Sequence, residues 1–400
     1  MNTYKYTAKD KNSHAAIGML EAASEIEAAD ILHRKELIVV SLESVKSRAP
    51  KTRGGRIGLE DLVIFTRQLS TMIDSGVPLV QSLGILGEQI ENKRLKDVVV
   101  SVRQDIEAGT SFYDALAKYP SVFSELFINM AKAGEASGTL NEVLDRLAVY
   151  LEKAAALTRK IKSAMVYPAI LISMAILITA GLLIKVVPIF KEIFASFGGE
   201  LPLPTRILIE TSNLLGRYFL FIVALFIILG LLFKKYIATR KGRYYFDSWK
   251  LNMPVFGPLF QKVALAKLTR TFATLVKSGI SILNALDIVG KSSGNKVIEE
   301  AIFDCRSAVR EGELISRNLA KSKVFPIMVT RMIGVGEQTG QLEKMLSKIA
   351  DFYDEQVDAA VTAITSTIEP IVISFLGIVI GGIVVSLFLP IFSITELISQ

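Results

Sequence analysis

Apolar residues follow two different patterns along this chain. From Leu59 onward they recur every three or four positions, as at Leu62, Phe65 and Leu69, which is typical of helices that bury one face. Residues 163–184, 218–233 and 370–395 instead contain no charged residue at all. Since about 20 apolar residues cross a bilayer, we predict transmembrane helices at 165–187, 213–234 and 370–393. For the second run, which is shorter, a buried core helix is the alternative.

The helical pattern occurs twice along the chain. Residues 66–118 and 269–321 align without a gap at an offset of 203 and share 15 identical residues. One residue is then lost, and at an offset of 202 Pro168 and Pro188 match Pro370 and Pro390. Both copies contain Gly-Glu-x-x-Gly, at 134–138 and 336–340, and both end in an apolar run. The sequence therefore predicts a duplicated unit, a bundle of about six helices followed by a membrane span.

The first 58 residues have a different pattern. Short extended runs at 3–8, 15–20 and 37–43 surround a helix that begins at Ser24, so we predict a small ββαβ module. The predicted fold class is an all-α membrane protein with two repeated cytoplasmic helical bundles, three transmembrane helices and this N-terminal module. The predicted parts are the module 1–45, a basic linker 46–58, bundle one 59–163, span one 165–187, a periplasmic loop 188–212, span two 213–234, a cytoplasmic connector 235–261, bundle two 262–369, span three 370–393 and a periplasmic tail 394–400.

Charge predicts the orientation. Lys and Arg gather before the first span and after the second, whereas the loop between them holds only Lys191 and Arg206 before Arg217. Cytoplasmic flanks carry such an excess, so we expect the N-terminus and both bundles in the cytoplasm and the C-terminus in the periplasm. The polar N-terminus predicts no cleaved signal peptide. These clusters account for the net charge of +7, so we expect no nucleic-acid partner, and the single cysteine, Cys305, excludes an intrachain disulfide.

Motifs for catalysis do not fit their contexts. Gly290-Lys291-Ser292 resembles the end of a phosphate-binding loop, but Ala285 occupies the position where that loop needs glycine. The same stretch spells a nucleophile elbow, yet the preceding segment is helical and the two histidines, His14 and His33, lie in the N-terminal module. No His/Cys cluster has zinc spacing. We predict that the chain is not an enzyme and binds no cofactor.

Four acids in copy two share one helix face. Their spacing of i, i+3, i+4 and i+7 precedes span three, and the face is specific to copy two. It is either a solvated surface, a docking surface for a basic partner, or a loose divalent-cation site. The acids are Asp351, Asp354, Glu355 and Asp358, and the equivalent residues of copy one are Val149, Glu152, Lys153 and Ala156.

Small residues and one base mark the predicted spans. Gly377-x-x-x-Gly381 lets another helix approach closely, either a second copy of the chain or span one. Lys185 near the outer end of span one either extends toward the interface or pairs with an acidic group of a partner.

The repeated strings resemble those of a known family. FTRQLSTMIDSGVPLVQSL and LTRTFATLVKSGISILNAL, AGEASGTL and GVGEQTGQL, MPVFGPL, YPAILI and EPIVIS are similar to the inner-membrane platform proteins of type IV pilus assembly and type II secretion, the PilC/GspF family. The resemblance covers almost the whole chain, with small departures at Ser281 and Glu369. It implies a non-enzymatic part that couples a hexameric cytoplasmic ATPase to the insertion of pilin or pseudopilin subunits into a fibre. Other inner-membrane assembly proteins and self-association into a homo-oligomer are also implied.

Alternatives remain at this level. A transporter built from parallel repeats is disfavoured because each copy supplies one span, and a membrane-anchored scaffold is also open. The sequence does not separate pilus assembly from secretion. Within the family reading, Glu135 and Glu337 are either contacts for the ATPase or incidental to turns made by Gly134, Gly138, Gly336 and Gly340. Arg67 and Arg270 open the matched helices and are further candidates for partner contacts.

Overall fold

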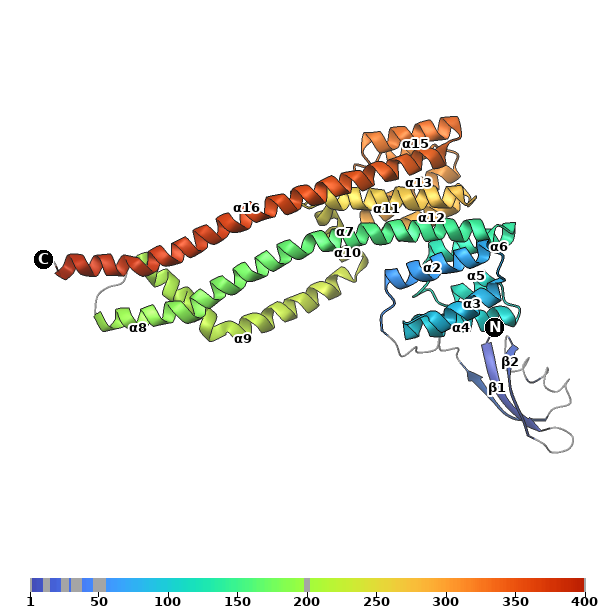
Figure 1. Cartoon of the computed structure of the whole chain (residues 1–400), viewed down its shortest axis with the longest axis horizontal. Helices are drawn as coiled ribbons and strands as arrows, with labels where there is room; N and C mark the ends of the chain where they lie inside the picture. The colour runs from blue at the N-terminus through green and yellow to red at the C-terminus, as the bar shows by residue number, and fades with distance from the viewer. Residues whose placement is uncertain are drawn as a thin grey trace. The chain divides into compact units, whose positions relative to one another are not determined.

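The computed structural model describes residues 2–9, 15–22, 29, 38–45, 55–197 and 202–398 (Figure 1). By its internal contacts the chain divides into two compact units, Met1–Asp61 with Ser75–Ser124, and Leu62–Asp74 with Glu125–Gln400. The second unit therefore holds parts of copy one together with all of copy two.

The first unit contains a three-stranded antiparallel sheet. Its strands are β1 (Asn2–Lys9), β2 (Ala15–Ala22) and β3 (Ile38–Val45), in the order β2-β1-β3. Tyr6 of β1 is paired with Gly18 on one side and Leu42 on the other. The strands lie where the sequence predicts them. The helix expected from Ser24 falls mostly outside the described residues, so the ββαβ module stays a prediction.

Helices of the two copies correspond one to one. Copy two consists of α11 (Gly257–Lys277), α12 (Ile282–Ser292), α13 (Lys296–Arg310), α14 (Ile315–Leu319), α15 (Ile327–Thr339) and α16 (Leu342–Ile398). Their counterparts are α2 (Leu59–Asp74), α3 (Leu79–Gln89), α4 (Lys93–Glu107), α5 (Phe112–Ala117), α6 (Glu125–Ser137) and α7 (Leu140–Gly181). The caps repeat too, because Asn92 and Asn295 each accept hydrogen bonds from two backbone N–H groups of α4 and α13.

Two helices run without a break from a bundle into an apolar segment. Leu140–Ile193 and Leu342–Pro390 are long and apolar enough to cross a membrane. Inside the bundles these helices bury apolar residues such as Leu147 and Ile349, whereas further along Leu177 and Ile378 are more than 70% exposed, as expected of a surface that lipid covers. Helix α7 continues through Pro168.

A third candidate span is bent. It consists of Leu203–Tyr218 and Val223–Ile237, at 71° to each other, within α9 (Leu203–Ile237). The predicted span 213–234 therefore crosses the bend. The region 188–212, predicted from the sequence as a periplasmic loop, contains α8 (Val187–Phe197) and the start of α9. Apolar residues explain the difference, since Val187 and Ile209 pack with Ile383 and Leu387 of α16 in one buried cluster.

Two hydroxyl groups of α9 compensate for prolines in the other spans. Residues Leu182–Val186 form a π-helical turn, in which the Leu183 carbonyl would pair with the N–H of residue 188, but Pro188 has none. Ser212 Oγ instead donates to the Leu183 carbonyl at 2.5 Å. Pro390 likewise leaves the Ser386 carbonyl without its helical donor, and Thr205 Oγ1 donates to it. Because a membrane interior offers no water to pair with carbonyls, α9 supplies the missing donors.

Candidate functional site

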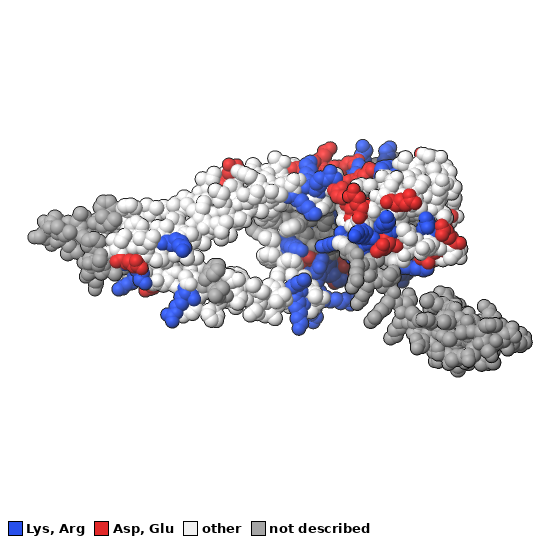
Figure 2. Space-filling model, turned by 60° about the horizontal axis from the view of Figure 1, so that its bottom comes forward, with Lys and Arg blue, Asp and Glu red and all other residues white. Residues whose placement is uncertain are grey.

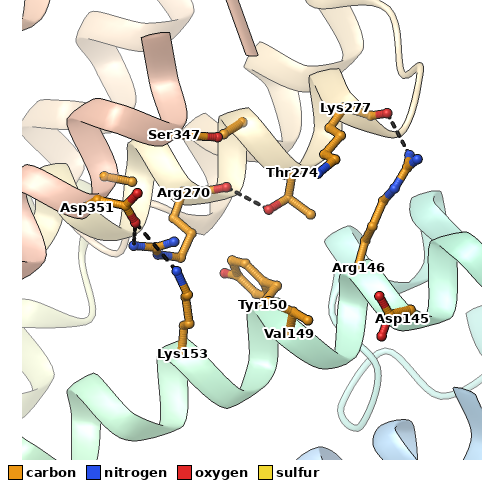
Figure 3. Close-up of a pocket in the computed structure, with 12 residues that line it drawn as sticks. Asp145, Arg146, Val149, Tyr150, Lys153, Arg270, Thr274, Lys277, Ser347 and Asp351 are labelled. Atoms are coloured by element: carbon orange, nitrogen blue, oxygen red, sulfur yellow. Dashed lines mark hydrogen bonds and ion pairs between the residues drawn. The ribbon is translucent and has the colours of Figure 1, made fainter. Parts of the chain in front are cut away.

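The two copies meet in the second unit at a pocket of about 240 Å³ between α7, α11 and α16 (Figure 3). Side chains from all three helices point into it, and bases outnumber acids among them. Most of the partner-binding residues expected from the sequence lie in or beside this junction. The pocket is lined by Asp145, Arg146, Val149, Tyr150, Lys153, Arg270, Ala273, Thr274, Lys277, Ser347, Ala350 and Asp351.

The repeated arginines join the first helix of each copy to its long helix, α2 to α7 and α11 to α16. Arg67 Nε lies 2.6 Å from Glu152 Oε1, and its Nη2 lies 2.8 Å from Glu152 Oε2, a bidentate pair. Its Nη1 also donates to Asp145 at 2.7 Å. In copy two, Arg270 Nη2 donates to Asp351 at 3.1 Å and to Asp354. Both arginines, predicted to be partner contacts, therefore join helices within their own copy.

Bases from copy one pair with two of the four acids on the acidic face of copy two. Lys153 Nζ lies 3.5 Å from Asp351 Oδ1, and Lys160 pairs with Asp358. Burial opposes ionisation of Asp351, but the hydrogen bond from Arg270 and the charge of Lys153 together lower its pKa. Glu355, the fourth acid, is exposed. In the described part of the chain no group of three or more His, Cys, Asp or Glu is placed to hold a metal ion.

Neutral and backbone contacts complete the junction. Tyr150 is half-buried, and its hydroxyl lies 3.1 Å from Thr271 Oγ1 of α11; the burial of this hydroxyl raises the pKa of the tyrosine. Arg146 Nη1 donates to the Lys277 carbonyl at 2.6 Å and so caps the last turn of α11. Sequence reasoning missed Arg146, Tyr150 and Lys160, because their partners lie more than a hundred residues away in the other copy.

The two Gly-Glu-x-x-Gly turns place glycine where geometry demands it. Gly138 and Gly340 have φ of 73° and 68°, in the left-handed region. A Cβ on Gly134 would lie 3.0 Å from Val143 Cβ, and one on Gly336 would lie 2.9 Å from Leu342 Cα. These glycines let α6 approach α7 and α15 approach α16.

The glutamates of these turns differ in exposure between the copies. The carboxylate of Glu337 accepts from the backbone N–H groups of Ile315 at 2.5 Å and Ser316 at 3.0 Å, so it caps the start of α14. A capping role accounts for Glu337 without a partner protein. Glu135, its counterpart on α6, is exposed.

The membrane residues selected from the sequence lie on open surfaces. A Cβ on Gly377 or Gly381 would meet nothing within 4 Å, so span one does not pack on these glycines. Lys185 is exposed within the π-helical turn. Both positions are accessible to lipid or to another membrane helix.

The nucleotide-binding and esterase motifs have structural explanations. Gly290 lies inside α12, where a Cβ would be 3.1 Å from the Phe303 ring, and Lys291 pairs with Asp287 at 3.0 Å and Glu125 at 3.2 Å. Cys305 is buried, which raises the pKa of its thiol to about 12 and leaves little reactive thiolate at neutral pH. The described chemistry of the junction is ion pairing and helix packing.

Comparison with known proteins gives matches along the whole chain. The profile "Type II secretion system (T2SS), protein F" matches residues 65–188 and again 268–390, the two copies of the repeat, and the profile of that protein's N-terminal domain matches residues 1–43. A relative named "Type IV pilus assembly protein PilC" from Myxococcus xanthus is 43% identical over 399 residues, covering 98% of this chain and 94% of the relative.

Two further relatives carry both names of the family. A "Type IV pilus assembly protein PilC" from Thermus thermophilus is 41% identical over 98% of either chain. A "Type II secretion system protein F" from Vibrio cholerae is 30% identical over the full length of both. The duplicated bundles, their apolar helices and these end-to-end matches show that the chain belongs to the type II secretion system protein F family, which includes the pilus assembly protein PilC.

Proposed function

We propose that this chain is the inner-membrane platform of a type IV pilus or type II secretion machine. In this role it couples a hexameric cytoplasmic ATPase to the insertion of pilin or pseudopilin subunits into a fibre, and it catalyses no reaction itself. The observation that carries the proposal is the end-to-end likeness to relatives named for both machines.

The helical architecture supports such coupling. Helix α16 is 57 residues long and belongs to bundle two at one end and to the apolar segment at the other. Helix α7 does the same for copy one over 42 residues. A continuous helix is a stiff rod with a rise of about 1.5 Å per residue, so a rotation or tilt of a bundle would move the membrane segment with it. Arg67 joins α2 to α7, and Arg270 joins α11 to α16.

The proposed orientation places both bundles in the cytoplasm and the C-terminus in the periplasm. A reporter fused after Gln400 should then behave as periplasmic, and one fused after Arg243 as cytoplasmic. A cytoplasmic C-terminus would mean that α9 does not cross the membrane.

The junction between copies is the proposed point at which motion passes from one rod to the other. Lys160→Glu places two acids together at the pair with Asp358 and should reduce the change that the full chain causes in the ATPase turnover. Lys160→Glu with Asp358→Lys restores an opposite pair and should restore the effect, in turnover and in fibre assembly or secretion. If the single variant inserts, folds and supports both normally, the junction does not transmit motion.

Glu355 and Glu135 are the exposed acids that we propose as contacts for a basic face of the ATPase. Glu355→Lys leaves the ion pairs of the junction in place. It therefore tests binding of the ATPase separately from the passage of motion through the junction. Reduced copurification of the ATPase with Glu355→Lys or Glu135→Gln, at unchanged chain stability, would support docking there. Normal copurification with both would remove these two residues from the interface.

The open faces of Gly377 and Gly381 are the proposed contact for a second copy of the chain. Gly377→Leu should weaken cross-linking between copies in native membranes. Unchanged cross-linking would assign that face to lipid or to another protein.

A further inference from the structure

Helix α10 (Arg240–Asn252) follows the third candidate span after a sharp turn. A Cβ on Gly242 would lie 2.1 Å from the Tyr236 carbonyl oxygen, and Thr239 Oγ1 accepts from the Gly242 N–H at 3.1 Å. No side chain other than hydrogen fits at this turn. Its geometry therefore sets the position of α10 relative to the end of α9.

Aromatic contacts also hold α10 to the apolar segment. Phe233, which belongs to the apolar half of α9, meets Phe246 edge to face at a centroid distance of 5.4 Å. Phe246 in turn stacks on Trp249 at a centroid distance of 6.0 Å. Lys250 Nζ lies 4.3 Å from the centroid of the Phe246 ring. This series of rings places Trp249 near the level at which α9 leaves its apolar stretch.

The opposite side of α10 is fixed to bundle two. Asp247 is 1% exposed, accepts from the Lys296 backbone N–H at 2.9 Å at the start of α13, and pairs with Arg243 at 3.0 Å. It is the one acid between residues 234 and 250. Because it is buried and paired, it adds no negative charge to the exposed surface of α10. The helix thus joins the bundle to the membrane end of α9.

The remaining face of α10 is exposed, basic and aromatic. Lys241, Tyr245 and Trp249 are spaced four residues apart and so form one stripe along the helix. Tyr245 is 64% exposed and Trp249 is 59% exposed. Figure 2 shows basic side chains gathered where the white apolar helices approach the charged bundles. Besides Lys241, the exposed bases of this part of the chain are Lys234, Lys235, Arg240 and Arg243.

We propose that this face of α10 lies in the membrane interface and binds anionic lipid headgroups. Tyr and Trp prefer the headgroup level, where the ring is in a partly apolar layer and its polar atom is hydrated. Juxtamembrane Lys and Arg are attracted by the negative surface of a leaflet that contains anionic lipid. The face adjoins an apolar segment and carries no exposed acid of its own, which favours a lipid surface over an acidic protein. Bundle two would then rest on the leaflet through α10.

Trp249 is the sole tryptophan of the chain, so its fluorescence reports on this face directly. The full chain is reconstituted in vesicles of phosphatidylcholine, alone or mixed with phosphatidylglycerol, with quencher groups placed either near the headgroup or at the chain end. We expect stronger quenching by the shallow groups. In a second set of vesicles only one of the two lipids carries bromine. Brominated phosphatidylglycerol should then quench Trp249 more than brominated phosphatidylcholine does. Soluble glycerol phosphate should not compete.

Charge removal tests the basic part of the proposal. Arg240→Gln with Lys241→Gln should lower the preference for phosphatidylglycerol several-fold, on the order of tenfold for two bases near a charged surface. Lys344→Gln with Lys348→Gln removes the same charge from exposed positions at the start of α16 and is the matched control, expected to change nothing. Emission in the vesicles and thermal unfolding would show that each variant is folded.

Two results would overturn the inference. Trp249 that is quenched by aqueous iodide and by neither shallow nor deep lipid groups would place the face in water, free for a protein partner. Quenching that is equal for both headgroup classes, and unchanged by Arg240→Gln with Lys241→Gln, would show an interfacial position without recognition of anionic lipid.

Discussion

Copies one and two have an arginine at the same position of the repeat, but the acids that pair with it are spaced differently on the long helix. Arg67 spans two turns of α7, with Asp145 on one side and Glu152 on the other, whereas Arg270 holds Asp351 and Asp354 one turn apart on α16. Arg270 is also more enclosed, with 14% of its side chain exposed against 35% for Arg67. Asp351 is then shared with Lys153 of copy one. We call each arginine with its paired acids on the long helix a clamp. Only the clamp of copy two is part of the junction between the copies.

The largest difference between copies is expected at the helix-packing glycines. Alanine gains about 1 kcal/mol of helix propensity over glycine, but overpacking costs about 1–3 kcal/mol. At Gly336 the new Cβ would lie 2.9 Å from a backbone atom, so Gly336→Ala should destabilise the chain, by about 1–2 kcal/mol net. At Gly134 the new Cβ would lie 3.0 Å from a side-chain carbon and 3.1 Å from the nearest backbone atom, Leu140 Cα, so Gly134→Ala should destabilise the chain less than Gly336→Ala does.

Thermal unfolding of the full chain in detergent would measure both variants. Gly377→Ala, which meets nothing within 4 Å, is the control and should not lower the unfolding midpoint. Equal losses for Gly134→Ala and Gly336→Ala would show that α15 can shift on α16 as readily as α6 on α7.

The arginines should rank in the order of their enclosure. Arg270→Met keeps most of the apolar stem but leaves Asp354 without its partner, and should cost about 1–2 kcal/mol. Arg67→Met leaves carboxylates that water reaches more easily, and should cost about 0.5–1 kcal/mol. The midpoint of thermal unfolding at neutral pH distinguishes them. A larger loss of stability for Arg67→Met would mean that the bidentate pair with Glu152 contributes more than the exposure of Arg67 takes away.

The sequence predicts the repeat, the helix count of each copy and the long apolar helices because these follow from local periodicity and from two similar strings. It singles out Arg67, Arg270 and Asp351–Asp358 as candidate partner contacts, which stays a prediction. It does not predict the ion pairs that these residues make within the chain, since partners such as Lys160 come from packing one copy on the other. Helix α8 is not predicted from the sequence, although Phe190, Ile193 and Phe194 recur at helical spacing, because the whole stretch between the first two apolar runs is taken as their connection. Ser212 and Thr205 gave no signal, because a hydroxyl donor is recognised only once the proline-released carbonyl lies beside it.

Those hydroxyls allow a comparison of the two proline-containing spans. Ser212→Ala should cost about 1 kcal/mol, the usual size of a hydrogen bond between membrane helices. In a Pro188→Ala background residue 188 regains an N–H that can pair with its own helix, so the same substitution should cost little. Thr205→Val and Pro390→Ala form the matching cycle for α16. Additive losses in either cycle, measured as unfolding midpoints, would show that the hydroxyl does not serve the proline.

The smallest effect is a difference in acid sensitivity between the two clamps. The hydrogen bond from Arg67 lowers the pKa of Glu152 from its ordinary value of 4.5, although burial acts in the other direction. The lowered pKa means that the clamp stabilises the fold above pH 4.5 and that this contribution is lost as the pH falls through the lowered value. For Asp351 the ordinary value is 3.8 and the pKa is again lowered, so the contribution of this carboxylate should stay complete down to pH 3.8, whereas that of Glu152 begins to fall below pH 4.5. Glu152→Gln should therefore lower the unfolding midpoint at neutral pH and lose this effect as the pH falls below 4.5, whereas the deficit of Asp351→Asn should persist to lower pH. Glu355→Gln, at an exposed acid outside both clamps, controls for general charge loss. A deficit of Glu152→Gln that stays constant into strong acid would show that the side chain acts through packing, and that the two copies do not differ in their acid response.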